Sequence, residues 1–69
     1  MPISGKQAAK ILGRHGFIFS RQRGSHAVFI KQTSTGKQVA VVPMHGELKK
    51  GTLRSIAKQS GLEAKEFGV

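Results

Sequence analysis

The chain has 69 residues and no cysteine, and its twelve Lys and Arg residues outnumber its three acidic residues, giving a formal net charge of +9. This length allows one domain, residues 1–69, with a small core. The lack of cysteine excludes disulfides and thiolate metal sites, and no apolar run approaches the roughly 20 residues that span a bilayer. We expect a cytoplasmic protein whose charge favours a polyanion: nucleic acid, an acidic membrane surface or an acidic protein.

The first expected element is a helix over residues 4–15. Ser4 and Gln7 have the spacing of a capping box, in which each side chain accepts a hydrogen bond from the other residue's backbone. Gly16 is well placed to end this helix. The apolar residues that share one face of it are Ala8, Ile11 and Leu12.

Three strands are expected next, over residues 17–23, 25–31 and 38–42. Gly24 marks a tight turn between the first two, and residues 33–37 have the composition of a loop. Two successive hairpins make an antiparallel meander. Both alternating sets of residues in the second and third strands are apolar, so the face away from the helices is expected to carry an apolar patch. The alternative is that an edge residue or the C-terminal turn covers this face. The alternation does not decide which face carries His26.

A second helix is expected over residues 50–60, with Gly61 as its end, and one more helical turn is expected over residues 62–67. The resulting order is α-β-β-β-α. We therefore predict an α+β fold in which two helices pack on one face of a three-stranded antiparallel sheet. Double-stranded-RNA-binding domains are a prominent example of this order, although the order alone does not establish function.

The carboxylates are too few and too scattered for metal-dependent nuclease chemistry. The chain contains no Asp, and its acids are Glu47, Glu63 and Glu66. Oxygen-ligated Mg²⁺ needs at least one or two carboxylates in one place. No two of the three histidines have the spacing of zinc ligands. We expect no metal and no other cofactor.

RNA can be cut without a metal, because its own 2′-hydroxyl can attack the adjacent phosphate once a base removes the proton. Histidine suits this role because it exchanges a proton near neutral pH. Cationic side chains then stabilise the charge that develops on the phosphate. The sequence is rich in cations and has three histidines, so these residues are the candidates for catalysis.

His26 is the best placed of the histidines. It follows the turn in the segment Arg21-Gln22-Arg23-Gly24-Ser25-His26. Gly24 lets the backbone approach a ligand closely, and the two arginines can each grip phosphate oxygens in a bidentate manner. The alternative is that His26 is a hydrogen-bonded, half-buried strand residue with no chemical role.

His45 lies in the loop before the second helix, where it is a candidate general acid or phosphate ligand. The alternative is a solvated or capping histidine. His15 ends the first helix, where a cation suits the helix dipole, so a structural role is expected for it.

Lys49 and Lys50 precede and open the second helix, where backbone N–H groups can bind phosphate. The alternative is a solvated charge pair. Arg54 and Lys58 extend the basic stripe along one face of the helix at i,i+4 spacing.

Several sequence blocks together resemble one protein family. The blocks are Ser-Gly-Lys-Gln at residues 4–7, His-Gly-Phe at 15–17, Arg-Gly-Ser-His at 23–26, Val-Pro-Met-His at 42–45, Leu-Lys-Lys-Gly-Thr-Leu-Arg-Ser-Ile at 48–56 and Gly-Leu at 61–62. In this order and at these distances, they resemble the HicA-type toxins of bacterial toxin–antitoxin pairs. The resemblance covers nearly the whole chain.

The resemblance implies an mRNA interferase with a double-stranded-RNA-binding-like fold. It implies that His26 is the catalytic histidine, that mRNA is the substrate, and that the partner is a HicB-like antitoxin. The chain would then exist as a monomer alone or in complex with that antitoxin. One departure is a short loop between His45 and Leu48, which leaves the positions of His45 and Lys49 open.

Two other functions remain as alternatives. One is a module that binds RNA by shape without cutting it, for which replacement of His26 by Ala would change little. The other is a surface for an acidic partner or a membrane, although no strongly amphipathic basic helix with bulky apolar residues supports membrane binding. The residues do not decide whether His26, His45, a lysine or water would protonate the leaving oxygen.

Overall fold

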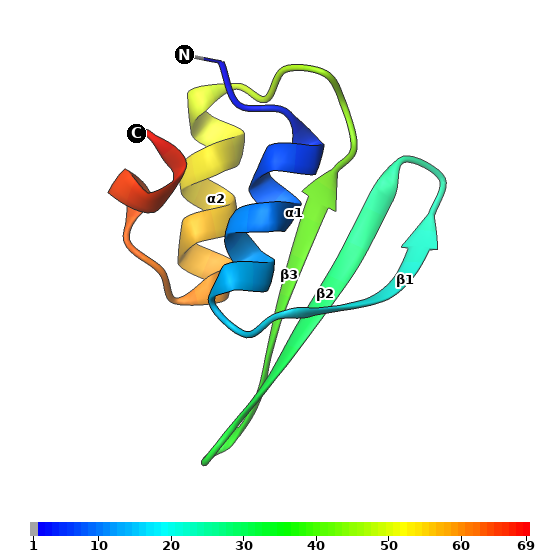
Figure 1. The fold of residues 1–69 in the computed structure, drawn as a ribbon, viewed down its shortest axis with the longest axis vertical. Coiled ribbons are helices and arrows are strands. Elements are labelled where there is room, and N and C mark those ends of the chain that lie inside the picture. Colours follow the sequence, from blue (N-terminus) through cyan, green and yellow to red (C-terminus); the bar gives the residue numbers. More distant parts are fainter. Residues whose placement is uncertain (1) are drawn as a thin grey trace.

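A computed structural model describes residues 2–69 of the chain. Its elements, in chain order, are α1 (Gly5–Arg14), β1 (Ile18–Arg23), β2 (His26–Thr33), β3 (Gly36–Pro43), α2 (Lys50–Ser60) and the 3-10 helix η1 (Ala64–Phe67). The strands form one antiparallel sheet in the order β1-β2-β3. Figure 1 shows both α-helices on the same side of the sheet. The predicted α-β-β-β-α order is confirmed.

The N-terminus of α1 is fixed by the predicted capping box. Ser4 Oγ accepts a hydrogen bond from the Gln7 N–H at 3.1 Å, and Gln7 Oε1 accepts one from the Ser4 N–H at 2.9 Å. At the other end, Gly16 adopts a left-handed conformation with φ of 92°. Because Ser4 and His15 are the caps, the helix is one residue shorter at each end than the predicted range.

The second hairpin differs from the prediction. Thr33 pairs with Gly36, so β2 and β3 extend through most of the segment expected as a loop, and only residues 34 and 35 make the turn. The prediction of a loop over residues 33–37 is therefore wrong. Its Thr, Ser and Gly residues are typical of loops, but they form strand ends where the hairpin projects beyond the helices and needs no apolar face (Figure 1).

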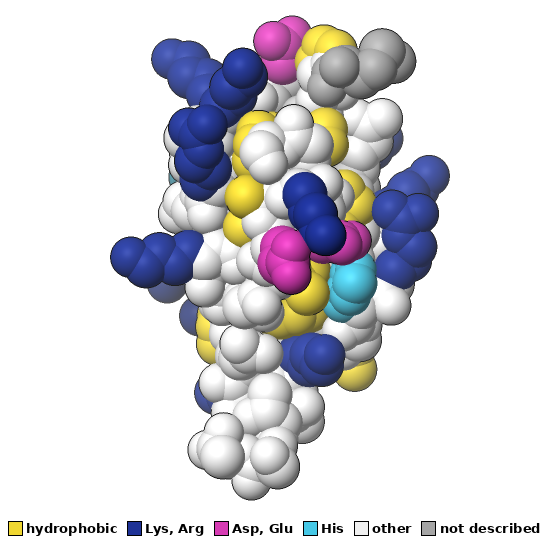
Figure 2. All heavy atoms as spheres, turned by 90° about the vertical axis from the view of Figure 1, so that its left-hand side faces the viewer, with side chains coloured by type: hydrophobic (Ala, Val, Ile, Leu, Met, Phe, Trp, Pro, Cys, Tyr) yellow, Lys and Arg dark blue, Asp and Glu magenta, His cyan; other side chains and the backbone are white. Residues whose placement is uncertain are grey.

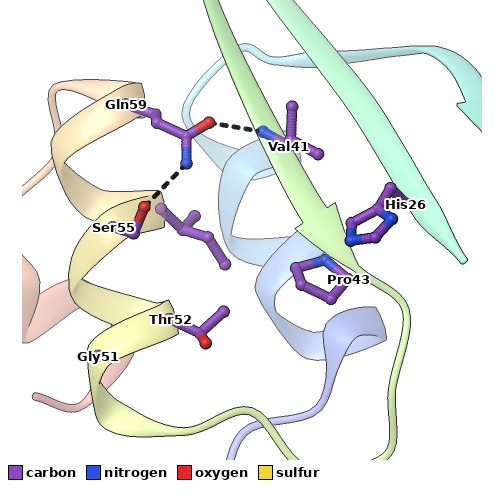
Figure 3. A pocket seen from close by; sticks show the side chains of 8 residues that line it. His26, Val41, Pro43, Gly51, Thr52, Ser55 and Gln59 are labelled. Carbon is purple, nitrogen blue, oxygen red and sulfur yellow. Dashed lines mark hydrogen bonds between the residues drawn. The ribbon is translucent and has the colours of Figure 1, made fainter.

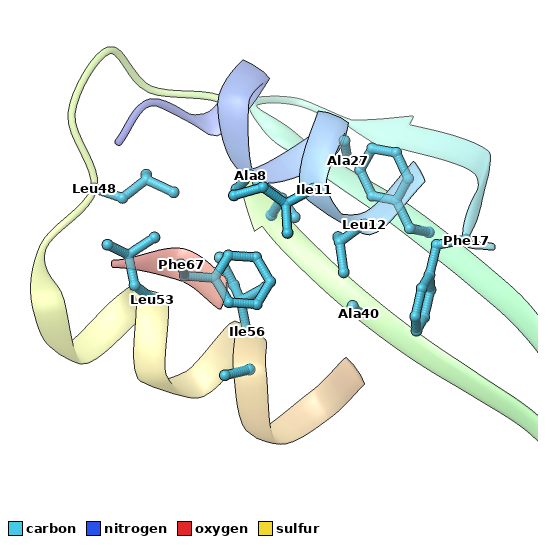
Figure 4. Packing of buried hydrophobic residues seen from close by; sticks show 13 residues of the cluster. Ala8, Ile11, Leu12, Phe17, Ala27, Ala40, Leu48, Leu53, Ile56 and Phe67 are labelled. Carbon is cyan, nitrogen blue, oxygen red and sulfur yellow. The ribbon is translucent and has the colours of Figure 1, made fainter. Parts of the chain in front are cut away.

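The hydrophobic core lies between the helices and the facing side of the sheet (Figure 4). The largest fully buried side chains are Leu12, Val42, Ile56 and Phe67, which come from α1, β3, α2 and η1. The C-terminal turn begins at Ala64 and not at the predicted residue 62. It places the fully buried aromatic ring of Phe67 against the two helices.

The loop between β3 and α2 is anchored by the start of α1. The Gly5 N–H donates to the His45 carbonyl at 2.8 Å, and the Leu48 N–H donates to the Ile3 carbonyl at 2.8 Å. A Cβ on Gly5 would overlap the Pro43 carbonyl oxygen. Only glycine therefore permits this close approach, which holds the loop in a defined position beside the sheet.

Candidate active site

His26 lies on the face of the sheet that points away from the helix-covered core. Residues directly opposite one another in an antiparallel pair place their side chains on the same face. His26 lies between Arg23 of β1 and Pro43 of β3 in such a row. The next residue, Ala27, is buried in the core, whereas His26 is exposed. We call this side, with His26, the outer face.

A β-bulge places both arginines of β1 on the outer face. Phe19 pairs with Phe29, but Arg21 pairs with Val28, so Ser20 is an extra residue in the ladder. The extra residue reverses the alternation beyond it. Arg21 and Arg23 therefore lie in successive cross-strand rows on the side of His26.

The outer face also carries the apolar patch expected from the sequence. Ile18, Ile30 and Val39 form one cross-strand row, and Ile18 and Val39 are 72% and 39% exposed. Val28 is buried but lies outside the core cluster. The patch is confirmed, and it adjoins the arginine rows.

A groove runs beside His26, between the edge of β3 and α2. His26, Pro43 and Thr52 line both of its two adjoining parts. One part, shown in Figure 3, is completed by Val41, Gly51, Ser55, Ile56 and Gln59. The other part is completed by His45, Glu47, Leu48 and Lys49. The sheet and the helix thus converge on one open cleft with His26 in its wall.

His45 is held close to the turn that precedes His26. The Met44 N–H donates to the Ser25 carbonyl at 2.6 Å, and His45 Nε2 lies 3.4 Å from Ser25 Oγ. Because His26 and His45 line the same part of the groove, the short loop that the sequence leaves ambiguous brings these two histidines together.

The cations around the groove lack acidic partners. Within residues 2–69 there are two ion pairs, His15 with Glu66 at 3.2 Å and Lys65 with Glu63 at 3.5 Å. Figure 2 shows acidic side chains, a histidine and a cationic side chain together in the middle of one face, with most of the other Lys and Arg side chains toward its margins. Positive charge on the remaining surface is therefore left for an external anion.

The predicted RNA-binding residues are brought together only in part. Lys49 lines the groove beside His26. Lys50 lines a neighbouring pocket with the C-terminal residues Phe67 and Val69. Arg54 is exposed on α2 but lines neither part of the groove. Gly24 has a left-handed φ of 58°, and a Cβ there would meet nothing within 4 Å, so this turn is open to a ligand.

His15 is separate from the groove. It caps α1, as expected, and its Nε2 atom pairs with Glu66 of η1. His15 thus links α1 to η1, whereas His26 and His45 line the groove.

Sequence reasoning missed the polar residues on the α2 wall, Ser55 and Gln59. Gln59 Oε1 accepts a hydrogen bond from the Val41 N–H at 2.9 Å, and Gln59 Nε2 donates to Ser55 Oγ at 3.1 Å. Their i,i+4 spacing on the polar side of the helix is the sequence signal that marks them as neighbours.

Among residues 2–69, no group of three or more His, Asp or Glu side chains is arranged to hold a metal ion. In the same residues, neither helix has the length and apolar character that a bilayer crossing requires.

Comparison with known proteins identifies the family. No curated protein is similar enough to the chain to count as a match. A family model described as the HicA toxin of bacterial toxin–antitoxin systems matches residues 5–62, a range that includes the whole groove. The chain therefore belongs to the HicA toxin family.

Proposed function

We propose that this toxin is a metal-independent endoribonuclease that cuts mRNA and thereby inhibits translation. The observation that carries the proposal is the position of His26: it is exposed on the outer face, opposite Arg23, and lines a groove together with His45 and Lys49. This arrangement offers a proton acceptor, a second histidine and unpaired cations around a space that is open to a polymer.

In the proposed reaction, His26 takes the proton from a 2′-hydroxyl, and the resulting oxygen attacks the adjacent phosphorus. The bond to the 5′-oxygen of the next nucleotide breaks, leaving a 2′,3′-cyclic phosphate and a 5′-hydroxyl. We assign the protonation of the leaving oxygen to His45. Supporting this assignment, both histidines line one part of the groove, and Ser25 Oγ is close enough to orient the His45 ring.

Phosphate binding is assigned to the cations that lack acidic partners. Arg21 and Arg23 lie in adjacent rows beside His26 and can each contact phosphate oxygens with two N–H groups. The backbone of Gly24 and Ser25 lies at the same turn. Lys49 approaches from the opposite wall of the groove. Lys50 and Arg54 lie outside the groove and would bind more distant phosphates of the same strand.

Family membership implies an antitoxin partner. We propose a HicB-like antitoxin that covers the groove, with the toxin a monomer when alone. The exposed apolar row formed by Ile18, Ile30 and Val39 adjoins the arginines. A partner that contacts the outer face can therefore bury apolar surface and neutralise charge together.

The reaction can be tested with one RNA in two forms, incubated with the protein in excess EDTA. The first form is all-ribose, and the second carries a single 2′-deoxynucleotide at the mapped cleavage position. We expect the first to be cut to a cyclic phosphate end and the second to stay intact at that position. Equal cutting of both forms, or binding of both without cutting, would exclude the proposed mechanism.

A further inference from the structure

Apart from His26, the residues that line the part of the groove shown in Figure 3 have no role in the reaction proposed above. The walls of this part are Val41 and Pro43 on the sheet, and Thr52, Ser55 and Gln59 on α2 (Figure 3). His26 lies in the same pocket. A group bound in this part of the groove therefore lies next to the 2′-hydroxyl from which His26 takes the proton.

The amide of Gln59 has a fixed orientation in this pocket. Its Oε1 atom accepts a hydrogen bond from the Val41 N–H at 2.9 Å. A flipped amide would place its NH₂ group against this backbone donor, so only one orientation satisfies both groups. Val41 can offer this N–H because β3 is an edge strand of the sheet. The fold thus orients a side-chain amide without any ligand.

The fixed amide leaves hydrogen-bond donors available. Gln59 Nε2 uses one hydrogen to reach Ser55 Oγ at 3.1 Å, and its second hydrogen has no acceptor among residues 2–69. Because Ser55 Oγ accepts that bond, its own hydroxyl hydrogen is free to donate. Two neighbouring donors on one helix suit a ligand edge with two neighbouring acceptors.

We propose that this pocket reads the identity of the nucleobase next to the cleaved phosphate, with Gln59 and Ser55 as specificity-determining residues. The inference rests on the proposed function in taking RNA as the ligand. A base edge with two adjacent acceptors is offered by guanine through O6 and N7 and by cytosine through N3 and O2. Adenine and uracil alternate donors and acceptors on the corresponding edges. The apolar Val41 and Pro43 side chains give the flat base a wall to lie against.

The test uses 2′-deoxy pentanucleotides in which one central base is flanked on each side by two abasic positions. Only one base can then occupy the pocket, and the missing 2′-hydroxyl prevents cleavage. Dissociation constants are measured for A, G, C and U with the wild-type protein. We expect G or C to bind about tenfold more tightly than A and U, the size of effect expected when a bidentate contact is lost.

The first variant is Gln59→Glu, which keeps an acceptor for the Val41 N–H but removes the donor. The matched control is Lys58→Gln, which lowers the net charge by the same amount at the neighbouring exposed position of α2. Both should weaken all four complexes through charge, but only Gln59→Glu should reduce the preference among bases. Ser55→Ala gives a second measurement, because it removes the other donor and places a strong helix former on an exposed position.

The inference is overturned if the wild-type protein does not distinguish the four bases, or if Gln59→Glu and Ser55→Ala both keep the wild-type preference. Cleavage of all-ribose RNA is measured in parallel to separate the two proposals. Base preference without cleavage would exclude the nuclease proposal and support base recognition by the pocket. Cleavage at positions that neither Gln59→Glu nor Ser55→Ala changes would exclude base recognition by the pocket and would leave the nuclease proposal standing.

Discussion

Arg23 lies directly opposite His26 across the β1–β2 pair, and the extra residue Ser20 determines that the two side chains share a face. An unbulged ladder that continued the Phe19–Phe29 register would pair Arg21 with Ala27 and direct it toward the core face. The basic character of the outer face therefore depends on strand register as well as on composition.

The register can be tested by exchanging neighbouring residues, Arg21→Gln with Gln22→Arg, which leaves net charge unchanged. Gln22 pairs with the buried Ala27, so its side chain lies on the opposite face from Arg21. We expect the exchange to weaken RNA binding. The plot of log affinity against log salt concentration should also become shallower, its slope falling in magnitude by about 1, because one phosphate contact is lost. The measurement is a salt titration of binding by fluorescence anisotropy.

The control for this exchange is Gln22→Ala. Gln22 Nε2 donates to the Gly24 carbonyl at 3.0 Å, and both variants lose this bond. Gln22→Ala should leave the salt slope unchanged. An equal slope for the exchange and the wild type would show that net charge, not the face on which the arginines lie, governs binding.

Gly5→Ala should destabilise the fold. The new Cβ would overlap the Pro43 carbonyl oxygen and lie 2.7 Å from Met44 Cα, so α1 and the β3–α2 loop must separate. We expect a loss of about 1–3 kcal/mol in the free energy of unfolding, the usual range for forced overpacking. Urea denaturation measures this loss.

Gly13→Ala is the matched control, because it makes the same chemical change in the same helix. A Cβ there meets nothing within 4 Å. Its helix propensity should raise the free energy of unfolding by roughly 0.5–1 kcal/mol. If Gly5→Ala is as stable as Gly13→Ala, the close contact at Gly5 does not matter to the fold.

His45→Gln should slow cleavage without a comparable loss of RNA binding. A positioned general acid contributes about 10²–10⁴-fold to a rate, so a loss in this range is expected for single-turnover cleavage. Ser25→Ala should give a smaller loss, because it removes only the hydroxyl 3.4 Å from His45 Nε2.

His15→Gln makes the same substitution at a histidine outside the groove. His15 pairs with Glu66 on the surface, so its loss should leave the cleavage rate close to that of the wild type. Equal rates for His45→Gln and wild type would remove His45 from the mechanism and leave water, a lysine or His26 itself as the proton donor.

The sequence predicts the local elements well because their signals are local. The capping box of Ser4 and Gln7 and the left-handed Gly16 place the ends of α1 to within one residue. The apolar pattern of β2 and β3 correctly indicates a sheet with apolar side chains on both faces. The polar hairpin end over residues 33–37 is mispredicted, because its pairing depends on the partner strand and not on its own composition.

The site is less predictable because three of its features depend on distant contacts. The bulge at Ser20 is a property of the β1–β2 ladder. The closeness of His45 to Ser25 depends on a loop anchored by Gly5 and Leu48. Gln59 enters the pocket because α2 lies along the free edge of β3. None of these contacts is encoded in the spacing of the residues along the chain.

Single-turnover cleavage of a mixed-sequence RNA in excess EDTA, comparing the wild-type protein with His26→Ala, tests most directly whether His26 catalyses metal-independent cleavage. His26 is exposed at the start of β2, so the substitution should leave the fold intact, and binding of the same RNA can be measured in parallel. If His26 is the catalytic base, cyclic-phosphate products form with the wild type only, and both proteins bind RNA. Equal cleavage by both proteins, or binding by both with cleavage by neither, would exclude this role for His26.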